Sequence, residues 1–110
     1  MSTTKEYFGY VLEQLSEIGD ISGRAMMGEY VLYYKDKVIG GIYDNRFLLK
    51  PVNAVKALMP DAPYELPYDG AKLMIAVQDI EDRGLMKNVI TSMYDELPFP
   101  KRRKPKLNRV

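Results

Sequence analysis

The chain has 110 residues, and its 46% apolar and 28% charged residues are typical of a single globular domain. It contains neither cysteine nor histidine, which excludes disulfides, thiolate nucleophiles and zinc–sulfur sites and removes the most common metal ligand. No segment resembles a signal peptide, and no apolar run approaches the ~20 residues that a membrane span needs. We therefore expect a cytoplasmic protein that does not associate with membranes.

The net charge of +1 conceals two parts of opposite sign. The first 97 residues hold ten cations against fifteen acids, a formal charge of −5. The last thirteen residues hold no acid and six cations: Lys101, Arg102, Arg103, Lys104, Lys106 and Arg109. We therefore predict a domain over residues 1–97 and a basic, proline-containing, flexible tail over residues 98–110.

The first helix is predicted over residues 4–17, where apolar residues recur at helical spacing. Thr3 followed by Glu6 fits a capping box, which satisfies free amide donors at a helix start. Gly19 is the type of residue that commonly ends a helix.

Four strands are predicted next, over residues 21–27, 30–34, 38–43 and 46–50. Gly28 breaks or bulges the first strand, and the paired Gly40-Gly41 indicates a bulge or a close backbone approach. Asp44-Asn45 tolerates positive φ and predicts a tight hairpin. Because such short connections force antiparallel neighbours, these strands should form a meander.

Both faces of this sheet are apolar. In the second strand, Val31 and Tyr33 point to one face, and Tyr30, Leu32 and Tyr34 point to the other. One face must pack on the helices. The other is either covered too or forms an exposed apolar patch that a partner protein or a second copy can use.

The remaining elements complete a single α+β domain with a mainly antiparallel sheet of about five strands, in the order α-β-β-β-β-α-β-α. Asn53 is predicted to cap a short helix that Pro60 ends. A loop over residues 61–72, with an extended piece at residues 64–66, leads to a fifth strand over residues 72–78, with Leu73 on its apolar face. Asp79 or Asp82 starts the last helix, whose buried stripe contains Leu85, Val89, Ile90, Met93 and Leu97.

Catalytic and metal-binding patterns are missing. The three acids Asp79, Glu81 and Asp82 are interpreted as first-turn residues of a helix, and no phosphate-binding glycine loop is present. Six methionines lie in apolar patterns, which favours core packing over a soft-metal site: Met26, Met27, Met59, Met74, Met86 and Met93. We therefore expect no enzyme, no cofactor and no metal.

The stretch from Arg24 to Lys50 resembles the N-terminal domain of the TfoX/Sxy family, bacterial proteins named for regulating natural competence. Residues 24–28, Arg-Ala-Met-Met-Gly, are similar to the family motif R-x-M-F-G, with Met27 in place of phenylalanine. The aromatic strand, the short hairpin, the Gly-Gly strand and Lys50 follow in the same order, and the resemblance extends over residues 4–97.

This resemblance implies a sheet packed by helices, similar to secretion-chaperone-like domains. It also implies a role near transcription, since the family's regulators act as co-activators with the cyclic-AMP receptor protein. Those regulators carry a second, C-terminal domain, where this chain has its basic tail.

We accordingly predict a small regulatory or adaptor domain that binds a protein, for example a transcription factor, or a second copy of itself. The candidate partner-binding residues are those of the motif: Arg24, Met26, Met27, Gly28 and Lys50. For Arg24 the structural alternative is an ion pair with Glu29 or with an acid on a helix. For the tail, non-specific nucleic-acid binding by counterion release competes with a purely solubilising role.

Overall fold

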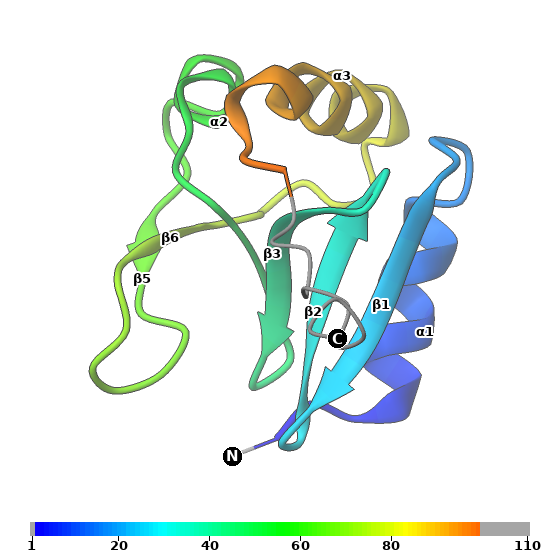
Figure 1. The fold of residues 1–110 in the computed structure, drawn as a ribbon, viewed down its shortest axis with the longest axis vertical. Helices are drawn as coiled ribbons and strands as arrows, with labels where there is room; N and C mark the ends of the chain where they lie inside the picture. Colours follow the sequence, from blue (N-terminus) through cyan, green and yellow to red (C-terminus); the bar gives the residue numbers. More distant parts are fainter. Residues whose placement is uncertain (1, 100–110) are drawn as a thin grey trace, which may run out of the picture.

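In the computed structural model, which describes residues 2–99, a single antiparallel sheet has its helices on one face (Figure 1). The six strands lie in the order β1-β2-β3-β4-β6-β5. The elements are α1 (Lys5–Gln14), β1 (Ile21–Met26), β2 (Glu29–Tyr34), β3 (Lys37–Tyr43), β4 (Arg46–Leu49), α2 (Asn53–Leu58), β5 (Tyr64–Glu65), β6 (Met74–Ala76), α3 (Arg83–Met93) and the 3-10 helix η1 (Tyr94–Glu96). The predicted α+β class is confirmed, and the extended piece near residue 64 forms the sixth strand.

Strands β1 to β4 form the predicted meander, with a two-residue turn at each connection. Both central residues of every turn have positive φ, the conformation of type I′ turns, whose twist matches that of the flanking strands. The central pairs are Met27-Gly28, Lys35-Asp36 and Asp44-Asn45. The predicted Asp44-Asn45 hairpin is therefore confirmed.

Strand β3 passes very close to both of its neighbours at Gly40 and Gly41. A Cβ atom on Gly40 would lie 2.1 Å from the carbonyl oxygen of Leu48, and one on Gly41 would lie 2.6 Å from that of Tyr30. Just before them, the register of β3 against β2 shifts so that Ile39 is an extra residue, a β-bulge. The predicted bulge and close backbone approach are both present.

All three helices pack on the same face of the sheet. The ring of Phe8 in α1 stacks on Tyr30 of β2 with centroids 3.9 Å apart, and α1 lies behind β1 and β2 in Figure 1. Helices α2 and α3 lie together at the top of that view. The fully buried side chains that join sheet and helices include Val11, Leu15, Leu32, Ile39, Ile42, Phe47, Leu49, Val55, Ile75, Met86, Val89, Ile90 and Met93.

Two predicted helix caps are wrong. The N-cap of α1 is Thr4, whose side chain accepts a hydrogen bond from the amide of Tyr7 at 3.1 Å, whereas Thr3 is buried and donates to the Glu29 carboxylate at 2.7 Å. Thr3 is therefore used to attach the N-terminal segment to the sheet.

The second error concerns α2, where Asn53 does not cap the helix. The first two amides of α2, those of Asn53 and Ala54, donate hydrogen bonds to the two carboxylate oxygens of Glu96 at 2.9 and 2.8 Å. A charged group from η1 thus satisfies donors that the helix itself leaves free. At α3 the predicted cap is confirmed, since Asp82 accepts from the amide of Leu85 at 3.0 Å.

A buried lysine attaches the end of the described chain to the β2–β3 turn. The side chain of Lys37 is almost fully covered, and its Nζ donates to the carbonyl oxygen of Tyr94 at 3.0 Å. The same nitrogen lies 3.8 Å from the ring centroid of Tyr94 and 4.3 Å from that of Phe99. These two cation–π contacts and one hydrogen bond partly replace the hydration that the ammonium group loses.

The close approach at Gly40 gives a testable prediction. In Gly40→Ala the new methyl group meets backbone atoms, which cannot move aside, so the free energy of unfolding should fall by about 3 kcal/mol. Gly9→Ala is the matched control. Nothing lies within 4 Å of its Cβ position in the middle of α1, so this variant should be more stable by about 0.5–1 kcal/mol.

Urea denaturation followed by circular dichroism measures both variants. Equal stability of Gly40→Ala and the wild type would show that β3 tolerates a side chain at this position.

Candidate functional site

The sheet face opposite the helices is only partly covered. A small buried cluster of Tyr43, Leu48 and Ala76 lies on this face, with Met74 packed against it. The loop between β5 and β6 passes over it and places Tyr68 beside Tyr43, with ring centroids 5.9 Å apart. This loop leaves two hollows between itself and the sheet.

The larger hollow, which we call the trough, has a volume of about 470 Å³. It is lined by Val38, Gly40, Tyr43, Lys50, Pro51, Val52, Pro67, Tyr68, Ala71, Lys72, Leu73 and Met74. A second hollow of about 380 Å³ shares Tyr43 and Tyr68 with the trough and is otherwise lined by Met26, Met27 and Glu29. We call this side of the sheet, with the residues that line either hollow, the open face.

Several large apolar side chains of the open face are exposed. Leu73 is 50% exposed and Tyr68 is 59% exposed. The sequence predicted Leu73 within the fifth strand, on its apolar face, but β6 begins only at Met74 and Leu73 borders the trough. Apolar groups that converge on a hollow with few polar groups are typical of a binding surface.

Met26 and Met27 are exposed as well, so their assignment to the core is wrong. Met26 is 46% exposed and Met27 is 97% exposed. Met27 also has φ +50, in the left-handed region that bulky side chains seldom adopt. Met27 therefore neither packs in the domain nor suits its turn, and nothing in the fold explains a methionine there.

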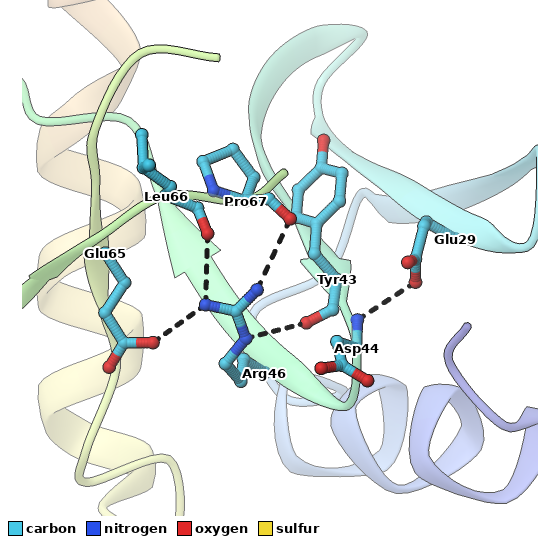
Figure 2. Close-up of polar contacts among 7 residues, drawn as sticks. All are labelled: Glu29, Tyr43, Asp44, Arg46, Glu65, Leu66 and Pro67. Carbon is cyan, nitrogen blue, oxygen red and sulfur yellow. Dashed lines mark hydrogen bonds and ion pairs between the residues drawn. The ribbon is translucent and has the colours of Figure 1, made fainter. Parts of the chain in front are cut away.

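Arg46 holds the loop that forms one wall of the open face (Figure 2). Its guanidinium donates to the carboxylate of Glu65 at 2.8 Å and to the carbonyl oxygens of Leu66 and Pro67 at 3.1 and 3.3 Å. Its Nε donates to the carbonyl oxygen of Tyr43 at 3.1 Å. One side chain thus attaches the start of the β5–β6 loop to the β3–β4 hairpin.

Glu29 organises the other end of the open face. Its carboxylate accepts hydrogen bonds from the amide of Asp44 at 3.0 Å, drawn in Figure 2, and from the Thr3 hydroxyl at 2.7 Å. The Thr3 hydroxyl in turn accepts from the amide of Asn45 at 3.1 Å. Sequence reasoning missed Arg46 and Glu29 as organising residues, because their partners lie 15–26 positions away.

Tyr43 is a neutral polar group between the two hollows. Burial raises the pKa of its hydroxyl above the ordinary value of 10.0, and the neighbouring Tyr68, Glu29 and Tyr33 raise it further. The hydroxyl therefore stays protonated at physiological pH and can still donate a hydrogen bond.

Comparison with known proteins places this domain in a family. Residues 13–89 match the model of the TfoX N-terminal domain. The chain belongs to the TfoX N-terminal domain family. The resemblance inferred from the motif at residues 24–28 is confirmed.

A relative from Spirochaeta aurantia, named as an uncharacterized 12.7 kDa protein in the trpE 5′ region, is 34% identical over 107 residues. The aligned part covers 96% of this chain and 93% of the relative. No solved structure gave a significant match.

The structure separates the TfoX motif residues. Met26 and Met27 line the smaller hollow, while Lys50 lines the trough. Gly28 has φ +87 and completes the β1–β2 turn, a backbone role.

Arg24 lies on β1 opposite Val31, and since Met26 is two residues further on, both point to the open face. Among residues 2–99 Arg24 has no ion pair, so the expected pairing with Glu29 or a helix acid is wrong for this part of the chain. The six predicted cations of the tail, Lys101 to Arg109, lie outside the described residues.

Within residues 2–99, no group of three or more acids is arranged to hold a metal ion. In the same part of the chain, no helix is long and apolar enough to cross a membrane.

The contacts of Arg46 give a prediction for this wall of the TfoX domain. Arg46→Lys keeps the charge but loses the forked donors, so we expect the unfolding free energy to fall by about 1–2 kcal/mol. Amide hydrogen exchange at residues 64–68 should also become faster, because the loop loses its attachment. Both are measured on one sample, by urea denaturation and by exchange followed with NMR.

Arg83→Lys is the matched control. Arg83 pairs with the exposed carboxylates of Glu13 and Glu17 at 3.7 and 3.2 Å, and such surface pairs contribute at most about 1 kcal/mol. If Arg46→Lys behaved like Arg83→Lys and left exchange at residues 64–68 unchanged, Arg46 would not be the attachment of this loop.

Proposed function

We propose that this TfoX-family domain is a non-catalytic, cytoplasmic adaptor that binds a protein partner through its open face. The observation that carries the proposal is Met27, a large apolar residue that is 97% exposed and held at φ +50. Residues kept in an unfavourable backbone conformation concentrate at functional positions. A contact with another protein gives this side chain the burial that its own domain does not.

The other residues of the open face also support the proposal that it binds a protein partner. Methionine side chains adapt to irregular surfaces, and tyrosines bring a large contact area with little loss of rotamer freedom. Met26, Met27, Tyr43 and Tyr68 line one hollow together, so an apolar group of a partner can contact all four. The family's link to competence regulation favours a partner from the transcription machinery.

Met27→Asn separates binding from folding. Asn-Gly is a preferred pair for a type I′ turn, so we expect the free energy of unfolding of the variant to be higher by about 0.5–1 kcal/mol. The same change removes the exposed apolar side chain and should abolish partner capture. Denaturation measures the first effect. Affinity capture from a bacterial extract, with identification of the bound protein, measures the second.

Lys87→Ala, at an exposed position on α3, is the control and should capture the same protein as the wild type. Recovery of that protein by Met27→Asn in undiminished amount would contradict a role for Met27. A wild-type chain that elutes only as a monomer and captures nothing would contradict the adaptor proposal.

The charge distribution favours a second candidate function, non-specific nucleic-acid binding by the tail. Thirteen residues with six cations and no acid follow a body of charge −5. Such a segment binds phosphates by releasing condensed counterions and needs no base contacts.

The corresponding prediction compares the full chain with a chain truncated after Leu97. Only the full chain should bind double-stranded DNA at low salt, and its affinity should fall with a log–log slope of up to about −5. Fluorescence anisotropy at several salt concentrations measures both. Equal binding by the truncated chain would assign the activity to the body, and no binding by either would leave the tail a solubilising segment.

A further inference from the structure

The trough carries two cations and no acid, although it belongs to an acidic body. Lys50 and Lys72 both line it: Lys50 follows β4, and Lys72 belongs to the loop before β6. Among residues 2–99 neither lysine forms an ion pair. Two acids of the surrounding segments are engaged elsewhere, since Glu65 pairs with Arg46 and Glu29 accepts from the Asp44 amide and the Thr3 hydroxyl, and Asp69 of the β5–β6 loop does not line the trough.

Apart from the two lysines, the lining of the trough is largely apolar. It includes Val38, Leu73 and Met74, together with Gly40 and the ring of Tyr43. A volume of about 470 Å³ accepts one or two large side chains. An occupant that matches both features brings an apolar group for the apolar lining and negative charges for the two lysines.

We propose that the trough binds a linear peptide segment of a partner protein in which one or two large apolar residues are flanked by acids. This inference rests on the proposed adaptor function and specifies the chemistry of the partner. Acids flanking the apolar anchor reach Lys50 and Lys72, while Arg24 on β1 is another unpaired cation on the same face of the sheet, outside the trough. Charge complementarity of this kind selects among partners more than it adds affinity.

The same charges argue against other occupants from this chain. The segment 98–110 carries six cations and no acid, so it is repelled by the lysines of the trough. A second copy that used the same face would bring its own Lys50 and Lys72 against these, because a two-fold interface pairs identical surfaces.

The test uses three blocked hexapeptides and the full chain labelled with ¹⁵N. The first has the sequence Glu-Glu-Leu-Phe-Glu-Glu, the second replaces its four acids by lysines, and the third replaces Leu-Phe by Ser-Ser. We expect saturable shifts of the amide signals around the trough, at residues 38–43, 50–52 and 68–74, with the first peptide alone. Lys50→Glu and Lys72→Glu should each weaken its affinity by about fivefold or more, since each removes one attraction and adds a repulsion.

Lys87→Glu changes the charge by the same amount on α3 and should leave the affinity unchanged. Equal binding of the lysine peptide, or equal weakening by Lys87→Glu, would overturn the preference for acids. Equal binding of the serine peptide would overturn the apolar anchor. Displacement of the first peptide by a DNA oligonucleotide, or shifts of the trough signals caused by dilution of a dimer, would assign the trough to another occupant.

Failure of this inference is distinguishable from failure of the adaptor proposal. If no peptide binds but a protein is captured in a Met27-dependent manner, the acidic-segment proposal is wrong and the adaptor function stands. If neither is seen, both are wrong.

Discussion

The close passage of β3 between β2 and β4 is the constraint on which both the core and the open face depend. The bulge at Ile39 changes the alternation of β3, so that Ile39 and Ile42, three residues apart, are both buried against the helices. In a regular strand they would point to opposite faces. The approach is feasible only because Gly40 and Gly41 have no side chains to meet the backbones of Leu48 and Tyr30. Gly40 also lines the trough, so β3 contributes to the core on one side of the sheet and to the open face on the other.

Polar contacts between distant segments then give the open face its outline. Arg46 binds the start of the β5–β6 loop through three acceptors, and a planar guanidinium fixes that geometry as an ammonium group cannot. On the other side, Glu29 joins the N-terminal segment to the β3–β4 turn. The two hollows thus lie between supports that are themselves firmly bonded, and a binding surface with such supports loses little conformational entropy on contact.

The elements that are specified by residues close together in the chain could be predicted from the sequence. Turn residues and strand alternation gave the meander, the Gly40-Gly41 pair indicated the bulge, and the Asp82 cap lies next to the helix that it starts. The errors concern partners from distant segments. The amides at the start of α2 are capped by Glu96, about forty residues further along the chain, and not by Asn53. Thr3 donates a hydrogen bond to Glu29 and takes no part in a capping box. Met26 and Met27 were misassigned because an apolar pattern does not distinguish the covered face of a sheet from its open face, where Met26 lies, or from a turn such as that of Met27.

The charges of the molecule are divided in a way that bears on its mode of action. Acids outnumber cations in residues 1–97, yet three of the cations that form no ion pair in the described part, Arg24, Lys50 and Lys72, lie on the open face. The basic tail begins next to Phe99, whose ring Lys37 contacts at the β2–β3 end of the sheet. Under the two proposals made above, the open face would take an acidic protein segment and the tail a phosphate backbone, and their like charge would keep the tail out of the trough. An adaptor that works beside DNA needs these two binding functions to be separate, and the division of charge along this chain supplies a physical reason for that separation.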